Sequence, residues 1–216
     1  MNQRRLEKFE RVVACRQPDL TVILENVWDS HNVGAVLRSC DSVGIKEIFV
    51  LNTEEKLVDQ QELVVGKRTS MGTSKWVDVH YYTDSEACFQ HVRKNTPTIL
   101  GTHLSEQSQE LYKLDLTQPV ALLFGNEMLG ISEKVLAMCD GNFNIPQVGM
   151  AESLNVSVAC ALSVYEAFRQ RKAKGYYGDN LRMPENMKIQ LLNEYVDRHK
   201  NKLKPKRIYQ KKGGLA

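Results

Sequence analysis

Short apolar runs separated by polar loops recur along most of the chain. Their β-branched and aromatic residues predict strands, which span residues 21–25, 45–51, 76–82, 98–102 and 120–124. Apolar residues at helical spacing predict helices at 4–16, from about 32, at 85–94 and at 132–139. Strands that alternate with helices indicate βαβ units. The fold class is therefore α/β, with a mostly parallel sheet flanked by helices.

Residues 144–162 combine a short strand, a loop and an apolar helix. Apolar residues recur through the helix at i, i+4, i+7 and i+8, which predicts that this face lies in the core. The residues of that face are Leu154, Val158, Ala161, Leu162 and Tyr165. Ser153 and Asn155 fall where a helix leaves N–H groups unpaired, so they can hold a ligand. The alternative for Ser153 is a plain N-cap.

Three polar loops follow predicted strands, at 26–34, 125–130 and 146–155. In open α/β sheets, ligands bind beyond the carboxyl ends of strands, so these loops are candidate site segments. None contains G-x-G-x-x-G, which disfavours a dinucleotide enzyme and the usual Rossmann methyltransferase. Asn32 is either an N-cap or a site residue. Arg38 stands among small residues that leave room for a substrate backbone, and its planar fork suits a phosphate or ribose.

Composition narrows the class of protein. A chain of 216 residues with 42% hydrophobic residues can bury one core with helical appendages. The five cysteines are odd in number and show no C-x-x-C, and the histidines lack ligand spacing. We therefore expect reduced cysteines, no metal and a cytoplasmic protein. No apolar run approaches about 18 residues and no signal peptide is evident, so no membrane span is expected.

The net charge of +3 is unevenly distributed. Residues 1–16, 169–174 and 198–212 carry +3, +4 and +8, which leaves −12 for the remainder. An acidic core with basic ends predicts contact with a polyanion such as RNA, although a solvated tail is the alternative for 198–212. The Gly-Lys-Arg sequence at 66–68 lacks the P-loop pattern, and we expect a mobile basic loop there that could touch RNA.

Three motifs in order carry a family resemblance. They are Asn32-x-Gly-Ala-x-x-Arg38, Leu123-Phe-Gly-Asn-Glu127-x-x-Gly130-Ile-Ser132 and Ser153-Leu-Asn-Val-Ser-Val-Ala159. Together they resemble the motifs of the SPOUT RNA methyltransferases, in the SpoU/TrmH branch. The basic N-terminal helix, residues 16–21, 102–105 and 165–171, and the basic tail extend the likeness over nearly the whole chain.

The resemblance implies a homodimer whose SPOUT domain, at 19–170, contains a deep trefoil knot around residues 144–165. A basic helix at 1–18 would contact RNA or a second copy, and residues 171–216 would form a basic helical extension. The implied reaction transfers a methyl group from S-adenosylmethionine to a ribose 2′-hydroxyl of tRNA, at guanosine 18 of the D-loop. Two alternatives remain open: ribosomal RNA or another tRNA position as the substrate, or a non-catalytic knotted RNA-binding protein.

The resemblance also implies a role for individual residues. The catalytic residues would be Arg38, Asn32, Ser153, Asn155 and Glu127. The cofactor would be bound by Thr102, His103, Leu104, Gly125, Asn126, Glu127, Gly130, Ile145, Ser153, Leu154 and Asn155. RNA would be bound by Arg4, Arg5, Lys8, Arg11, Lys67, Arg68, Arg169 and Arg171. Relatives are proposed to use the arginine that corresponds to Arg38 as a base, although arginine gives up its proton very reluctantly. Two roles therefore stay open for Arg38: the base, or the group that grips the neighbouring phosphate.

Overall fold

The computed structural model describes residues 1–54, 57, 72–151, 153–201 and 207–210. Within them, eight strands form one sheet in the order β5-β7-β4-β6-β1-β2-β3-β8, and every ladder is parallel. The strands are β1 (Leu20–Glu25), β2 (Glu47–Leu51), β3 (Asp78–Tyr82), β4 (Thr98–Thr102), β5 (Gln109–Glu110), β6 (Val120–Phe124), β7 (Gly141–Asn144) and β8 (Arg207–Gln210). The predicted α/β class with a mostly parallel sheet is confirmed.

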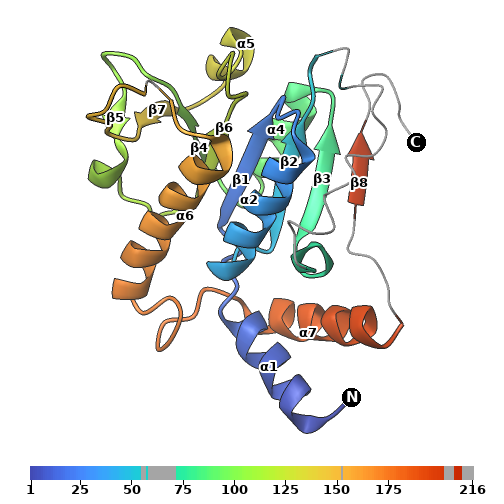
Figure 1. The fold of residues 1–216 in the computed structure, drawn as a ribbon. Coiled ribbons are helices and arrows are strands. Elements are labelled where there is room, and N and C mark those ends of the chain that lie inside the picture. Colours follow the sequence, from blue (N-terminus) through green and yellow to red (C-terminus); the bar gives the residue numbers. More distant parts are fainter. Residues whose placement is uncertain (55–56, 58–71, 152, 202–206, 211–216) are drawn as a thin grey trace.

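Helices cover both faces of the sheet and one of its ends (Figure 1). They are α1 (Gln3–Ala14), α2 (Ser30–Ser42), α4 (Ser85–Val92), α5 (Glu133–Leu136), α6 (Val156–Ala173) and α7 (Glu185–Lys200), with 3-10 turns η1 (Thr73–Lys75) and η2 (Leu111–Lys113). Helices α2 and α6 lie side by side on one face, while α4 packs on the other. No described helix combines the length and apolar character that crossing a membrane requires.

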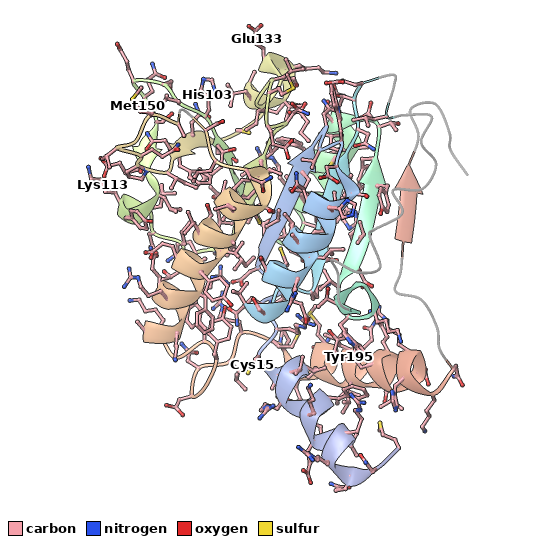
Figure 2. The ribbon with its side chains drawn as sticks, in the orientation of Figure 1. Cys15, His103, Lys113, Glu133, Met150 and Tyr195 are labelled. Atoms are coloured by element: carbon pink, nitrogen blue, oxygen red, sulfur yellow. The ribbon has the colours of Figure 1, made fainter. Side chains whose placement is uncertain are left out.

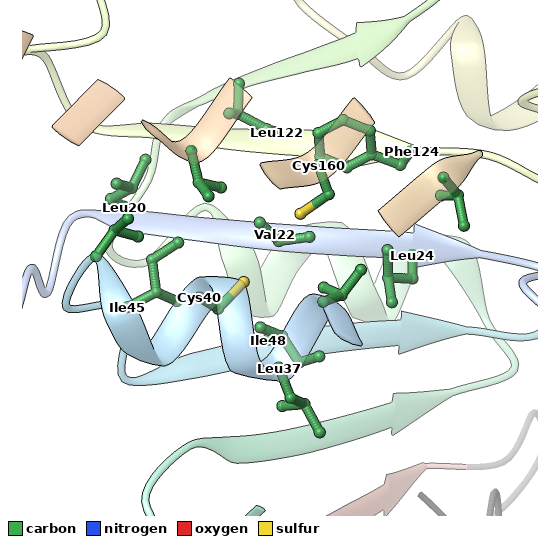
Figure 3. Close-up of a cluster of buried hydrophobic side chains, with 14 of the residues drawn as sticks. Leu20, Val22, Leu24, Leu37, Cys40, Ile45, Ile48, Leu122, Phe124 and Cys160 are labelled. Carbon is green, nitrogen blue, oxygen red and sulfur yellow. The ribbon is translucent and has the colours of Figure 1, made fainter. Parts of the chain in front are cut away.

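The alternation of β1 side chains builds two separate cores. Val22 and Leu24 point toward α2 and α6, where Cys40 and Cys160 also lie (Figure 3). Ile23 points to the opposite face and packs with residues of α4 and α5. All six residues of β1 are buried, as expected for a central strand covered on both faces.

A third core joins the two ends of the chain. Phe9 and Val13 of α1 pack against Leu191 and Tyr195 of α7, with the half-buried Trp76 beside them. The buried Arg16 guanidinium ties this pair to the sheet domain, because it donates to Asp41 Oδ1 at 2.5 Å and to Tyr195 Oη at 2.7 Å. A second buried arginine, Arg198, donates to Asp78 Oδ1 at 2.7 Å.

Several predicted boundaries shift. The strands at 98–102 and 120–124 are confirmed, whereas β2 and β3 each begin two residues later than predicted. Helix α2 begins at Ser30, and its N-cap is Asp29, whose carboxylate accepts from the His31 N–H at 2.7 Å. The alternative of Asn32 as the cap is therefore wrong. Helix α5 ends at Leu136, earlier than the predicted 139.

The predicted core face of α6 was wrong. Val158, Leu162 and Tyr165 are 46%, 40% and 50% exposed, and the buried face carries residues such as Cys160 and Val164 instead. Apolar residues occur on both faces of this helix, so spacing alone could not select the buried one. The helix also begins at Val156 with Asn155 as its cap, so the N-cap alternative for Ser153 was wrong.

The C-terminal extension is helical only in part. Helix α7 ends at Lys200, and residues 207–210 form β8, which pairs in parallel with β3. The predicted basic loop around 66–68 lies outside the described residues.

Candidate active site

A cavity of about 360 Å³ opens where the carboxyl ends of β4, β6 and β7 meet the start of α6. This is the edge at which parallel sheets bind ligands. It is lined by Thr102, His103, Leu104, Phe124, Gly125, Asn126, Glu127, Met128, Leu129, Gly130, Phe143, Asn144, Ile145, Gln147, Ser153, Leu154, Val156 and Ala159. Figure 2 places His103 and Met150 at this end of the molecule. Of the predicted cofactor-binding residues, all except Asn155 line the cavity.

The turn between β6 and α5 forms one wall. Gly125 packs so tightly that an added Cβ would lie 2.2 Å from the backbone carbon of Gly130, so no side chain fits there. Asn126 and Gly130 exchange two backbone hydrogen bonds of 3.0 and 2.8 Å. Gly130 has a φ of 68°, a conformation that favours glycine. The wall is therefore a closed turn with fixed N–H groups.

The Asn126 side chain fixes this turn from inside. Its Oδ1 accepts from the backbone N–H groups of Met128 and Leu129 at 2.8 and 3.1 Å. Its Nδ2 donates to the carbonyl of Asn26 at 3.0 Å, which links the turn to the end of β1.

Polar side chains from three segments converge beside the cavity. Asn32 Nδ2 donates to Glu127 Oε1, and Asn155 Nδ2 donates to Asn32 Oδ1 at 3.1 Å. Asn155 Oδ1 in turn accepts from the N–H of Ser157 at 2.9 Å. One hydrogen-bonded chain thus connects α2, the turn after β6 and the N-terminus of α6.

Arg38 does not join this chain. Its side chain is exposed on α2, and it makes no hydrogen bond or ion pair with a described residue. Ser42 lies one helical turn further along the same face, and its Oγ is 3.1 Å from the hydroxyl of Tyr165 on α6. Arg38 therefore stands near the exposed seam between α2 and α6.

The predicted RNA-binding residues fall into four groups, of which the buried Arg171 is the last. The first group lies on α1 and is exposed; its members are Arg4, Arg5, Lys8 and Arg11. All of them except Arg5 line a surface groove together with Glu7. Arg169 is also exposed and is paired with Glu166 at 2.7 Å. Lys67 and Arg68 lie outside the described residues.

The assignment of Arg171 to RNA was wrong. Its guanidinium is fully buried and donates to Asp19 Oδ1 at 2.6 Å, and also to the carbonyls of Leu116 and Gln118. Burial acts to raise the pKa of Asp19, but its ion pairs with Arg171 and Arg182 outweigh burial and lower it. Arg16 and Arg198 are buried in the same way, so part of the terminal positive charge anchors the fold.

Sequence reasoning missed Glu25, the last residue of β1. It is fully buried, and it accepts from both the N–H and the hydroxyl of Ser132, just beyond the turn that lines the cavity. The sequence signal that could have identified Glu25 is a lone acidic residue at the end of an apolar strand. No set of three or more metal-ligating side chains lies together in the part of the chain that the structure describes.

Comparison with known proteins places the fold and the cavity in context. Residues 19–165 match the model of the SpoU rRNA Methylase family. A tRNA (guanosine(18)-2'-O)-methyltransferase of Thermus thermophilus is 39% identical over 192 residues, which cover 89% of this chain and 95% of the relative. The Aquifex aeolicus TrmH/SpoU tRNA modifying enzyme has a TM-score of 0.81 and 30% identity, covering 92% of this chain and 98% of that one. An AdoMet-bound rRNA methyltransferase from Sinorhizobium meliloti has a TM-score of 0.60 and 27% identity, covering 74% and 59% of the two chains.

Proposed function

Because the chain belongs to the SpoU rRNA Methylase family, we propose that it methylates the ribose 2′-hydroxyl of guanosine 18 in tRNA, with S-adenosylmethionine as the donor. The family that the three ordered motifs predicted is confirmed. The choice of tRNA rests on the named Thermus relative, which matches along almost its whole length. The choice of cofactor is supported by the AdoMet-bound Sinorhizobium structure.

The observation that carries this proposal is the cavity joined to the Asn32, Glu127 and Asn155 hydrogen bonds. Its volume falls within the range of about 300 to 1,000 Å³ that is usual for small-molecule sites. Leu104, Ile145 and Leu154 offer apolar walls for an adenine ring. Glu127 and Ser153 add polar side chains to the lining, which suit the polar parts of a ligand. The residues present therefore fit S-adenosylmethionine.

When bound, S-adenosylmethionine supplies an electrophilic methyl group on a sulfonium. The residues of this chain must place a ribose hydroxyl in line with that methyl, and such alignment can lower a barrier by about 7 to 11 kcal/mol. Glu127 is the single carboxylate among the described lining residues, and Asn32 fixes one of its oxygens. We assign these two residues to orienting the hydroxyl. The planar fork of an arginine suits a phosphate, so we assign Arg38 to the adjacent phosphate.

The first test replaces Asn155, whose amide bonds to Asn32 and to the start of α6. We expect Asn155→Ala to lower methyl transfer about tenfold or more, because one net hydrogen bond is worth about 1 kcal/mol and the alignment of its partners is lost as well. The assay follows labelled methyl from S-adenosylmethionine into a tRNA transcript. The matched control is Asn186→Ala, an exposed asparagine on α7 whose side chain makes no hydrogen bond with the described residues.

Two further substrates test the target nucleotide. A tRNA with 2′-deoxyguanosine at position 18 lacks the acceptor oxygen and should receive no methyl. Transfer to that substrate, or transfer to ribosomal RNA alone, would contradict the proposed reaction. Complete absence of transfer with measurable RNA binding would favour the non-catalytic alternative.

We also propose that two copies form a homodimer through the exposed apolar residues of α6. Val158, Leu162 and Tyr165 form a stripe along one side of the helix, and solvent-exposed apolar stripes of this kind mark protein interfaces. The stripe adjoins the seam near Arg38, so a second copy would cover the surface beside this residue. The knot implied by the family resemblance is consistent with the observed strand order and stays an expectation.

The extensions complete the proposal. We propose that exposed residues of α1 and Arg169 contact RNA phosphates, and that residues 19–170 form the SPOUT domain between extensions at 1–18 and 171–216. Lys67 and Arg68 stay part of the same proposal. We also propose that the protein acts in the cytoplasm, because a tRNA substrate is compatible with that location.

A further inference from the structure

Glu25 is a buried carboxylate with no positively charged partner among the described residues. It ends β1, is 0% exposed and forms no ion pair with any described residue. Burying an ionised carboxylate is unfavourable unless hydrogen bonds replace its lost water. Its two oxygens have such partners: Oε2 accepts from the Ser132 N–H at 3.0 Å, and Oε1 accepts from the Ser132 hydroxyl at 2.5 Å.

Both ends of the turn that walls the cavity are attached to the end of β1. Ser132 follows the turn, and Glu25 holds it. Asn126 near the start of the turn donates to the carbonyl of Asn26, the next residue after Glu25. Asn26 itself has a φ of 51° and its Oδ1 accepts from the N–H of Thr53, so it is fixed by the segment after β2. The position of the turn, and of Glu127 within it, therefore depends on residues 25 and 26.

We propose that Glu25 is a positioning residue that, when ionised, holds the Gly125–Gly130 turn, through Ser132, in the form that binds the cofactor. This inference rests on the proposed function, because it concerns the cavity assigned to S-adenosylmethionine. Glu25 does not line the cavity, so it acts through Ser132. Protonation would remove an acceptor from one oxygen and leave a Ser132 donor unpaired.

The surroundings of Glu25 favour protonation at milder acidity than usual. Burial raises the pKa of Glu25 above its ordinary 4.5, the bonds from Ser132 act in the opposite direction, and the nearby Glu54 raises it further. The nearby Thr53 side chain acts to lower the pKa of Glu25. Cys139, beyond α5, is a further ionisable neighbour: burial raises the pKa of its thiol, and the charges of Asp140 and Glu25 raise it further. None of these groups supplies a positive charge.

The sign of the pH effect follows. Above the raised pKa, Glu25 is ionised and the affinity for the cofactor is at its maximum. As the pH falls through that pKa, the turn loses its anchor and affinity falls, at a pH nearer to neutral than an ordinary glutamate would give.

The test measures the dissociation constant of S-adenosylhomocysteine by calorimetry from pH 5 to pH 8 with the full chain. We expect wild-type affinity to weaken several-fold toward pH 5. Glu25→Gln should bind several-fold more weakly at pH 8 and lose this dependence on pH, because the amide does not titrate. The matched control is Glu133→Gln, an exposed glutamate on α5 whose side chain makes no hydrogen bond or ion pair with the described residues and should keep the wild-type profile (Figure 2).

A second variant keeps the test decisive if Glu25→Gln does not fold. Ser132→Ala removes a hydrogen bond that stabilises the ionised carboxylate, so the loss of affinity should begin at a higher pH than in the wild type. Identical pH profiles in the wild type and in the variant that folds would overturn the role of Glu25. Absence of binding by the wild type at every pH would instead overturn the proposed function.

Discussion

At the scale of single residues, the arginines of the chain divide by what their guanidinium groups contact. Arg16 and Arg171 are fully buried and use several donors on carboxylates and carbonyls. Arg169 is exposed but paired with Glu166. Arg38 is exposed and has no partner among the described residues, so its planar fork is free to hold a substrate phosphate.

Arg38 can be tested by keeping its charge and changing its shape. We expect Arg38→Lys to lower kcat by about 10²-fold, the typical cost of removing one positioned donor, with little change in the KM for tRNA. Steady-state kinetics with a tRNA transcript measure both constants. Arg93→Lys is the control, because it makes the same exchange at the end of α4, where Arg93 pairs with Asp140 and does not line the cavity. A wild-type kcat for Arg38→Lys would move the catalytic role to another residue.

At the scale of elements, α1 presents two different faces. Phe9 and Val13 bury one face against α7, while the basic residues lie on the exposed remainder. Asn2 caps the helix by accepting from the Arg5 N–H at 3.0 Å. The basic face is therefore held rigidly on the molecule, which reduces the entropy lost when it meets RNA.

Removing three charges from α1 should weaken RNA binding without affecting the cofactor. For Arg4→Gln, Lys8→Gln and Arg11→Gln combined, we expect lower tRNA affinity and a shallower salt dependence, by about 0.7 to 0.9 for each phosphate that the protein no longer neutralises. Filter binding at several salt concentrations measures the slope. Lys113→Gln with Lys188→Gln is the control, because both lysines are paired with glutamates elsewhere on the surface. An unchanged slope in the α1 variant would mean that these charges face solvent and do not contact RNA phosphates.

Strands were easier to predict from the sequence than helix faces. Residues 120–124 form an apolar run between Pro119 and Gly125, and a strand buried on both faces leaves that signature. In α6, packing against distant segments decided which apolar face is buried, and local spacing does not contain that information. The same limit applied to Arg171, because its partner Asp19 is 152 residues away.

The candidate site was predictable as a set of segments but not as a set of bonds. Loops after parallel strands had to meet at one edge, so the convergence of 125–130 and 146–155 followed from the fold class. The bond from Asn32 to Glu127 spans 95 residues, and nothing local specifies it. Glu25 was missed because its role depends on Ser132, which is 107 residues further along the chain.

At the scale of the whole molecule, the apolar stripe on α6 has the same chemistry as a core but lies on the surface. We expect Leu162→Glu to convert a dimer into a monomer, because a buried unpaired carboxylate would be placed in the interface. Sedimentation velocity measures the change in oligomeric state. Methyl transfer should also fall if the reaction requires the second copy to cover the surface beside Arg38. Ile189→Glu on α7 is the control, since Ile189 is another exposed apolar helix residue. A monomeric wild-type protein would contradict the proposed interface.

The bond between Arg16 and Tyr195 has a consequence for biosynthesis. These two residues are 179 positions apart, so α1 leaves the ribosome long before its partner α7 exists. Until then, the apolar side of α1 lacks its cover from α7, and Arg16 lacks the Tyr195 hydroxyl as an acceptor. Contacts of such long sequence separation form late because closing the intervening chain costs entropy. Helix α1 is among the first segments to be synthesised. We nevertheless expect it to pack last, after the sheet domain has folded.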